Sequence, residues 1–416
     1  MDLKFEDALT ADKLTALMRS TWTWDDRALR RDLSSLLVDV AAANGVTDEA
    51  IAKALRARSL AVGARFAADV LGPHLIADAG NASRDQFVAA ATDPTTFDRA
   101  GSAAHSEVRR RTTDYLSTLY EAQYPQESTW LKLATAQDPG LGAAMRGYGY
   151  SLSTTPLFSN IGLAWQSLRA LGTDGTEYRE RIESGELRAT LAAAEHSGSW
   201  DPTLVRTKAE PDGDSWRLAG TKLFVPDAAG SDIILTVARS IAGPSLYAVD
   251  GDAAGLSITE LDSIDGTRPL FRVELNDTPA VLLGKEGRGG ALMQKTMDAA
   301  MTALAGEQVG LIERAIAILR HRDLVDAGAD LAQVVLDHAT AVSLWTRAQS
   351  ADAEAGSAAM AHIGCSTASL RVASLTAEVA GDSEEAAAIL RRALSASLLL
   401  GGPAVFHERL LDRLGI

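Results

Sequence analysis

The stretch that decides the fold begins LRATLAAAEHSGSWD (residues 187–201), continues through WRLAGTKLFVP (216–226) and ends near Leu283. Within it, short apolar or alternating runs that favour β-strands lie at residues 187–194, 204–209, 216–218, 222–225, 233–238, 246–249, 256–261 and 270–275. Turn-forming residues separate these runs at 211–214, 219–220, 227–231 and 250–251. Many short strands at this spacing predict an all-β barrel or sandwich of about 100 residues.

Both flanks of this stretch have the periodicity of helices instead. In the first flank, from Asp7 to about Arg181, apolar residues recur on one helix face, as Leu33, Leu36 and Leu37 do. The candidate N-caps there are Thr10, Thr47 and Ser83, and loops are predicted at residues 93–109 and 140–147. In the second flank, a long and mostly buried helix is predicted from Gly289, with further helices at residues 331–351, 358–380, 384–399 and 407–414.

This order of elements predicts a mainly α fold with an inserted β-barrel. We expect an N-terminal helical domain at residues 1–185, a middle β domain at 186–286 and a C-terminal helical bundle at 287–416. The ordinary apolar content of the 416 residues is enough for a core of that size.

The composition limits the classes of partner. Acidic residues outnumber basic ones by 55 to 40, and the formal charge of -15 excludes nucleic acid and an anionic membrane surface as main partners. A local basic pocket for a phosphorylated ligand stays open. The first residues have neither a basic nor an apolar signal segment, and no apolar run reaches the roughly 20 residues of a membrane span. We therefore expect a cytoplasmic protein.

Cysteine, histidine and one glycine-rich segment suggest no chemistry of their own. The single cysteine, Cys365, stands among small residues, so a small core residue is favoured over a catalytic thiol. The histidines His321, His338 and His362 lack the spacing of metal ligands, so no metal site is predicted. The segment GKEGRGG (284–290) lacks the spacing of either nucleotide motif, and an ordinary strand-to-helix connection is predicted there.

Several strings in and after the central stretch resemble the acyl-CoA dehydrogenase family, in that family's order. ESGELRAT (183–190) and LAAAEHSGSWD (191–201) resemble its lead-in and the strand usually written ALTEPGAGSD, with Glu195 and Asp201 kept. WRLAGTKLFVP (216–226) resembles W-x-L-N-G-x-K-x-W-I-T-N, and AGSDIILTVAR (229–239) resembles A-D-x-x-x-V-x-A-R. DGTR (265–268), the pair Leu283-Gly284, and then Gly306, Gly310 and Ala315 resemble the close of the barrel and the first helix of the bundle. The resemblance implies that family's fold, in which flavin and substrate lie where barrel and bundles meet.

The resemblance also implies a reaction. In this family an acyl thioester is oxidised across its α and β carbons: a carboxylate removes the α proton, and the β hydrogen leaves as hydride to FAD. The usual base follows a Gly-Gly turn in the pattern H-G-G-x-G-F-T-W-E, and GGPAVFHE (401–408) places Glu408 at that spacing. The other base position, in L-D-x-E-R, matches MDAAM (297–301), which has no carboxylate there. Glu408 is therefore the candidate base, a surface residue of the last helix being the alternative, and Ser197 and Ser199 are expected at the substrate.

The expected flavin contacts depart from the family's pattern. Ala194, beside Glu195, stands where the family has a flavin-contacting Thr, and Phe224 stands for the aromatic residue near the isoalloxazine ring. Pro226 replaces the Thr near flavin N5 and offers neither a hydroxyl nor an N–H, which leaves the backbone N–H of Val225 as a donor. The family's R-x-Q-F-G and P-E-x-Y-G-G motifs are not found. The resemblance thus implies an FAD site of divergent form.

Three functions fit these residues, and fold alone does not separate them. The first is a flavin-dependent acyl-CoA dehydrogenase with a divergent site. The second is a companion subunit of a heteromeric dehydrogenase, whose partner supplies part of the flavin site. The third is an enzyme that uses the scaffold for other chemistry on a carrier-bound or unusual substrate. The resemblance implies a homo-oligomer, or a hetero-oligomer with a related subunit, packed through the C-terminal bundle.

Overall fold

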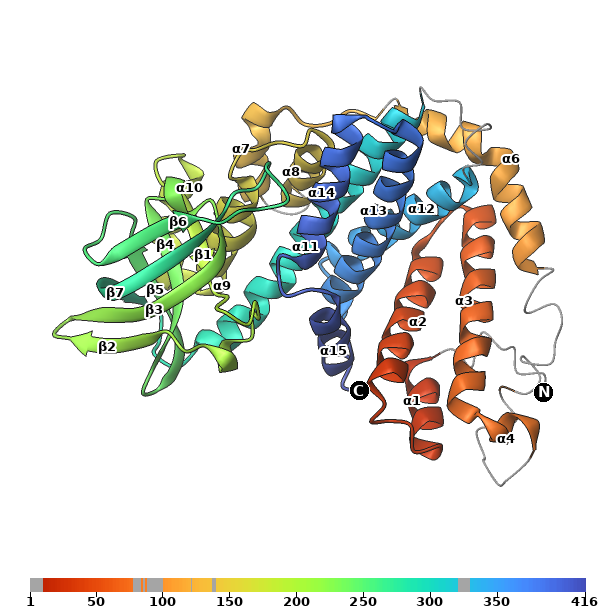
Figure 1. Ribbon diagram of the computed structural model, residues 1–416, viewed down its shortest axis with the longest axis horizontal. Coiled ribbons are helices and arrows are strands. Elements are labelled where there is room, and N and C mark those ends of the chain that lie inside the picture. Colours follow the sequence, from red (N-terminus) through yellow and green to blue (C-terminus); the bar gives the residue numbers. More distant parts are fainter. Residues whose placement is uncertain are drawn as a thin grey trace. The chain divides into compact units, whose positions relative to one another are not determined.

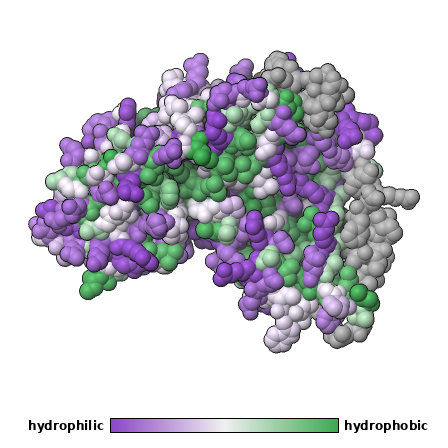
Figure 2. Space-filling view, in the orientation of Figure 1, coloured by the Kyte–Doolittle hydropathy of each residue, from purple (hydrophilic) through white to green (hydrophobic). Residues whose placement is uncertain are grey.

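The computed structural model of the chain describes residues 10–77, 84, 87, 100–120, 122–136, 140–320 and 330–416. The chain divides into two compact units (Figure 1). Unit 1 comprises residues 1–122, 315–382 and 403–416, and unit 2 comprises residues 123–314 and 383–402. Each unit therefore combines segments that lie far apart in the sequence. On the face drawn in Figure 2, hydrophilic side chains predominate, with apolar ones interspersed.

Unit 1 is built from helices in the described part of the chain. They are α1 (Ala11–Ser20), α2 (Arg27–Gly45), α3 (Glu49–Leu71), α4 (Pro73–Ile76), α6 (Ala100–Tyr120), α12 (Leu331–Ala348), α13 (Ser357–Ala380) and α15 (Pro403–Arg413). Helices α2 and α3 lie side by side, and α2 also contacts α12 and α15 (Figure 1). One core of this unit gathers apolar side chains from several helices, among them Leu17, Leu36, Phe66 and Leu411. The amphipathic face predicted around Leu33 and Leu36 is confirmed as buried.

The ends of these helices correct some of the sequence-based expectations. Thr10 caps α1 by accepting from the backbone N–H of Lys13, as predicted. The cap of α3 is Asp48, not Thr47, because a carboxylate one position later accepts from two backbone N–H groups of the first turn. Ser83 and residues 93–99 lie outside the described residues, whereas 100–109, predicted as loop, belong to α6.

Unit 2 begins with short helices. They are η3 (Glu127–Thr129), α7 (Trp130–Thr135), α8 (Gly140–Tyr150), the π-helical segment η4 (Phe158–Trp165), α9 (Gln166–Ala170), η5 (Gly172–Gly175) and α10 (Thr176–Glu183). The break predicted at residues 140–147 is wrong, since they are helical. The glycines there serve close packing: a Cβ on Gly149 would lie 2.1 Å from the carbonyl oxygen of Glu307, and one on Gly147 would lie 3.1 Å from Nε1 of Trp130.

A seven-stranded sheet follows in unit 2 (green to teal in Figure 1), made of β1 (Ala189–Ala192), β2 (Lys208–Asp212), β3 (Ser215–Pro226), β4 (Ile233–Ser240), β5 (Gly243–Asp250), β6 (Leu256–Glu260) and β7 (Leu270–Leu283). The strand order is β1-β4-β2-β3-β7-β5, with β6 paired to β7 and β4 paired also to β5. The predicted middle β region between two helical parts is therefore confirmed. The pairings β4–β2, β2–β3, β3–β7, β7–β5 and β5–β4 form a ring.

Two strand predictions need correction. The turn expected at residues 219–220 is wrong, because β3 runs through it as one strand with a register shift between Leu218 and Gly220. Gly220 has φ +154, and a Cβ there would lie 2.7 Å from Oγ1 of Thr207. The strand expected at 204–209 starts only at Lys208, because Pro202–Leu204 form a short 3-10 helix capped by Asp201.

Helices return after the sheet, as predicted. α11 (Gly289–Leu319) is the long buried helix, and α14 (Glu384–Leu398), capped by Ser383, completes unit 2. The last helix, α15, starts at Pro403 rather than His407, since proline is suited to a helix's first turn. Cys365 is a buried residue of α13, and burial raises the pKa of its thiol. Among the described helices, none taken singly has the length and apolar character of a membrane span; α14 and α15 taken together do so by length and composition only.

Segment 284–290 is the predicted strand-to-helix connection between β7 and α11. Its glycines permit close contact with the β4–β5 hairpin rather than a phosphate cradle. A Cβ on Gly287, which has φ +75, would lie 2.5 Å from the carbonyl oxygen of Ala242, and one on Gly289 would lie 2.6 Å from that of Pro244. The expectation of an ordinary connection is confirmed.

Candidate functional site

The exit of β1 and the second half of β3 lie side by side in unit 2 and carry the predicted flavin residues. Ala194 is buried, and its carbonyl oxygen accepts a hydrogen bond of 3.0 Å from the backbone N–H of Leu223. Its methyl group provides no hydrogen bond of its own. This position therefore fixes the path of the chain, and a side-chain contact with a ligand here would be apolar.

A buried ion pair holds the same two segments together. Nζ of Lys222 lies 2.8 Å from Oε1 of Glu195 and 3.2 Å from the carbonyl oxygen of Ala193. The Glu195 carboxylate also accepts from the backbone N–H of Arg206 and from both the N–H and the hydroxyl of Thr207. Burial alone would raise the pKa of Glu195, but these donors lower it to about 2, while burial lowers the pKa of Lys222 to about 8. Glu195 is thus fully occupied by the protein.

The end of β3 exposes one aromatic side chain. Phe224 has φ 58, in the left-handed region that costs a residue other than glycine roughly 1–3 kcal/mol, and 38% of it is exposed. Val225 and Pro226, by contrast, are buried and pair with Phe271 and Leu270 in the β3–β7 ladder. The carbonyl oxygen of Pro226 accepts from Oγ1 of Thr190 at 2.6 Å. The register shift before Val225 thus turns Phe224 outward while its neighbours stay in the sheet.

The loop after β1 carries the two serines expected at the substrate. Their hydroxyls accept from backbone N–H groups within the loop: Ser197 from Ser199 at 3.3 Å, and Ser199 from Asp201 at 3.1 Å. Trp200 anchors the same loop, since its Nε1 donates to the carbonyl oxygen of Leu399 at 3.2 Å. The loop is therefore tied to the segment just before the Gly401-Gly402 turn.

A buried charge network in unit 2 was missed in the sequence. Glu307 of α11 accepts from Nη2 of Arg268 at 2.5 Å and from Nε of Arg392, in α14, at 2.6 Å, and all three side chains are buried. Arg392 also donates to Oγ1 of Thr267 at 2.6 Å. Burial alone would raise the pKa of Glu307, but the two arginines lower it. The signal in the sequence was a glutamate inside the apolar run of a buried helix, which holds a second one at Glu313.

The network reaches the residue that follows the predicted flavin strand. Asp227 has φ 54 and accepts a hydrogen bond of 2.5 Å from the hydroxyl of Ser159, in the π-helical segment η4. Burial raises the pKa of Asp227 against the opposing effects of Ser159, Arg268 and Arg392. Irregular helical turns and left-handed residues of this kind often accompany functional sites. Arg268, in addition, lies over the ring of Phe158 at 5.1 Å.

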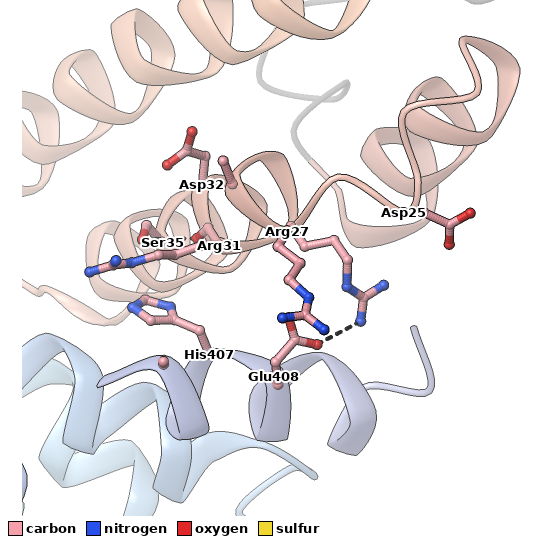
Figure 3. A pocket seen from close by; sticks show the side chains of 10 residues that line it. Asp25, Arg27, Arg31, Asp32, Ser35, His407 and Glu408 are labelled. Carbon is pink, nitrogen blue, oxygen red and sulfur yellow. Dashed lines mark hydrogen bonds and ion pairs between the residues drawn. The ribbon is translucent and has the colours of Figure 1, made fainter. Parts of the chain in front are cut away.

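Glu408, the predicted base, belongs to α15 in unit 1, whereas the predicted flavin residues belong to unit 2. Its side chain is 50% exposed and lies 3.1 Å from Nη2 of Arg30, at the edge of a polar cavity (Figure 3). The preceding residue, His407, is buried and hydrogen-bonds through Nδ1 to the hydroxyl of Ser34. Burial, followed by the charge of Arg31, lowers the pKa of His407 to about 4. Glu408 therefore has a cationic partner from α2 in its own unit.

Comparison with known proteins finds a sequence match in the middle region of the chain. Residues 190–278 match the family model "Acyl-CoA dehydrogenase, middle domain". Cyclohexane-1-carbonyl-CoA dehydrogenase of Geobacter metallireducens is 29% identical over 178 residues, which are 39% of this chain and 47% of the relative. The chain thus spans less than half the length of this relative.

Solved structures extend the likeness to the fold. Butyryl-CoA dehydrogenase from Megasphaera elsdenii superposes with a TM-score of 0.64 at 16% identity, covering 75% of this chain and 98% of that one. The prolyl acyl carrier protein oxidase AnaB superposes with a TM-score of 0.60 at 18% identity, covering 75% and 99%. The resemblance read from residues 183–315 is confirmed: this chain is similar to acyl-CoA dehydrogenases in sequence over its middle region and in fold over three quarters of its length.

Proposed function

We propose that this chain takes part in the flavin-dependent oxidation of an acyl thioester across its α and β carbons. The observation that carries the proposal is the match of residues 190–278 to the acyl-CoA dehydrogenase middle domain, within a fold of that family. The names of two of the proteins above indicate a coenzyme A thioester as substrate, and the name of the third indicates an acyl group on a carrier protein. We infer a substrate of the same class, an acyl group bound as a thioester to coenzyme A or to a carrier.

The residues at the exit of β1 and the end of β3 offer a flavin an apolar surface to pack against. Phe224 offers a partly exposed ring, and the loop after β1 lies beside it, since a Cβ on Gly198 would be 3.8 Å from the ring, in van der Waals contact. The side-chain donors are missing, because Ala194 and Pro226 have none and Glu195 is occupied by Lys222 and Thr207. FAD bound here would supply the hydride acceptor, and its polar contacts would fall to the backbone.

Glu408 stays the proposed base. Its carboxylate lies 3.1 Å from the guanidinium of Arg30, and a carboxylate is the type of group that accepts an α proton. Its half-exposed position is less favourable, because a base for an α proton works best in a site that excludes water. Glu408→Gln tests the role: we expect turnover of an acyl-CoA to fall by at least a hundredfold with folding unchanged, and undiminished turnover would remove Glu408 from the reaction.

The finer architecture belongs to the same proposal. The ring of strand pairings supports a small closed barrel. The proposed domain borders near residues 185 and 286 lie close to the two ends of that sheet. An oligomer packed through the C-terminal helices accords with the family. Light scattering on the purified chain, alone and with a related subunit, tests the last point.

The deciding experiment is the flavin content of the protein expressed alone. We expect a yellow protein with flavin absorbance bands and dehydrogenase activity toward an acyl-CoA with an artificial electron acceptor. A colourless protein that becomes yellow only when a related subunit is co-expressed would instead support the companion-subunit reading. A colourless protein that is active alone would overturn the flavin chemistry.

A further inference from the structure

Unit 1 has a polar cavity of about 1100 Å³ at the start of α2, and Glu408, the proposed base, lies at its edge (Figure 3). Arg27, Arg30 and Arg31 all line it, on a chain whose formal charge is -15. No acidic residue stands in the first turn of α2, so these cations lie at the positive end of the helix dipole, where positive charge is disfavoured. Three carboxylates, Asp25, Asp32 and Glu408, line the same cavity, so the arginines open to a ligand are those that these carboxylates do not bind directly.

Two of these arginines are not bound directly by the acidic residues around the cavity, although the charge of Arg31 acts on the neighbouring Asp32. Glu408 pairs with Arg30, but within the described part of the chain the side chains of Arg27 and Arg31 form no hydrogen bond or ion pair. Figure 3 shows the carboxylates of Asp25 and Asp32 turned away from Glu408 and His407. Two guanidinium groups at this cavity are therefore available to a ligand.

A second pocket adjoins the first and contains buried groups that lack partners. It has a volume of about 200 Å³ and shares Arg31 and His407 with the larger cavity. Thr340 lines it and is only 5% exposed, yet its Oγ1 has no hydrogen-bond partner among the described residues. Nε and Nη1 of Arg58 also lack a hydrogen bond. Arg58 is paired with two carboxylates of this pocket, Asp39 at 2.8 Å from Nη2 and Asp337 at 3.9 Å from Nη1. Buried donors without acceptors are costly, which points to an oxygen-rich ligand beside them.

We propose that these two joined pockets form a binding site for a phosphate-bearing ligand, with Arg27 and Arg31 at the outer cavity and Arg58 and Thr340 in the inner pocket. The planar guanidinium fork matches phosphate oxygens with two parallel hydrogen bonds. Side chains make this site rather than the helix end, because Asp26 already accepts from the first free N–H groups of α2. Glu408, the proposed base, borders this site, but phosphate binding is measured without turnover, so its outcome is distinguishable from that of the flavin chemistry.

Glu408 acts as an internal competitor in this site. A phosphate group carries more negative charge than one carboxylate, so the ligand takes over Arg30 and releases Glu408. Removing the carboxylate in Glu408→Gln therefore strengthens phosphate binding. This outcome is separate from any loss of turnover in the same variant, since binding is measured without substrate.

The test is calorimetric titration of the full chain with inorganic pyrophosphate at low ionic strength. We expect saturable binding that weakens about tenfold or more in Arg27→Gln and in Arg31→Gln, because a hydrogen bond to a charged group is lost in each. Thr340→Val, which keeps the shape of the side chain, tests the inner pocket. Arg56→Gln is the matched control: it removes one positive charge from an exposed position on α3, outside both pockets, and leaves binding unchanged.

The source of the phosphate is separated by competition. Coenzyme A that displaces pyrophosphate from the wild type identifies the thioester's own phosphates as the ligand, and pyrophosphate that stays bound against coenzyme A identifies a separate phosphorylated metabolite. The proposal fails if pyrophosphate does not bind, or if Arg56→Gln weakens binding as much as Arg31→Gln does. Circular dichroism of each variant confirms that the helices are retained.

Discussion

Replacing Glu307 by glutamine tests whether the buried charge network holds α11 and α14 together. The carboxylate uses both oxygens, at 2.5 Å from Arg268 and 2.6 Å from Arg392, and all three side chains are buried. Glutamine has the same shape, but its amide turns one acceptor into a donor and removes the carboxylate that binds both guanidinium groups, leaving Arg392 with Asp265 at 3.8 Å. Two hydrogen bonds to charged groups, at about 1.5–3 kcal/mol each, agree with the roughly 3–5 kcal/mol that breaking a buried ion pair costs.

The assay is urea unfolding followed by tryptophan fluorescence, together with hydrogen exchange of the amides in α11 and α14. With an m-value of about 2–3 kcal/mol/M, the expected loss moves the midpoint of the unit 2 transition down by about 1–2 M urea. Glu385→Gln is the control, because Glu385 also pairs with an arginine, Arg314, but at a partly exposed site where the pair contributes about 1 kcal/mol or less.

A second variant separates the charge from the packing. In an Asp265→Asn background, which neutralises the buried carboxylate 3.8 Å from Arg392, replacing Arg268, Glu307 and Arg392 together by Met, Leu and Met removes the charges of the network and keeps apolar volume, so we expect this triple variant to recover most of the lost stability. The reasoning is refuted if Glu307→Gln costs no more than Glu385→Gln, or if the triple variant is less stable than the single one.

Three further outcomes are expected. Between pH 6 and pH 3 the free energy of unfolding falls by about 1–2 kcal/mol more in the wild type than in Glu195→Gln, after allowance for solvent screening. The reason is that Glu195 has a folded pKa of about 2, so its contribution to stability is present above the unfolded pKa and is lost as the pH falls through the folded pKa. Urea titrations at both pH values check this. Ala194→Thr and Pro226→Thr, which restore the hydroxyls of the family pattern, raise the flavin content of the purified protein, measured by absorbance after heat release, and unchanged content would show that these positions do not contact flavin. Gly149→Ala lowers the melting temperature by the equivalent of about 2 kcal/mol, because its Cβ would lie 2.1 Å from the carbonyl oxygen of Glu307. An unshifted melting curve would show that α8 and α11 separate without cost.

The order of elements could be predicted because it depends on local periodicity. Strands with turn residues between them, and helices with one apolar face, are specified by a few neighbouring residues, so β4, β6 and α11 to α14 were placed within a few positions. The breaks predicted at Gly140–Gly147 and at Gly220 were wrong for one shared reason. Glycine was taken as a local breaker, whereas in both places it allows a close contact with another element, of Gly147 with Trp130 in α7 and of Gly220 with Thr207, which hydrophobic periodicity does not reveal.

The candidate site could be predicted only in part, since its partners come from separate segments. The Glu195–Lys222 pair joins two strings that the resemblance had already aligned, but nothing in the sequence linked Glu307 to Arg268 and Arg392, which lie 39 and 85 positions away. The pairing of Glu408 with Arg30 spans 378 positions. Long-range ion pairs of this kind become visible only when the fold brings their elements together.

The residues that match the family in the central stretch and those that differ from it have different physical roles. Glu195 and Lys222 fix the backbone of β1 and β3, and losing one partner of a buried pair costs about 3–5 kcal/mol, so the fold requires them whatever the chain binds. A hydroxyl at position 194 or 226 contributes nothing to that fold, because Ala194 and Pro226 already make the backbone contacts through their carbonyl oxygens. The middle region can therefore keep the family's architecture while its cofactor contacts change, and flavin content must be measured rather than inferred from the fold.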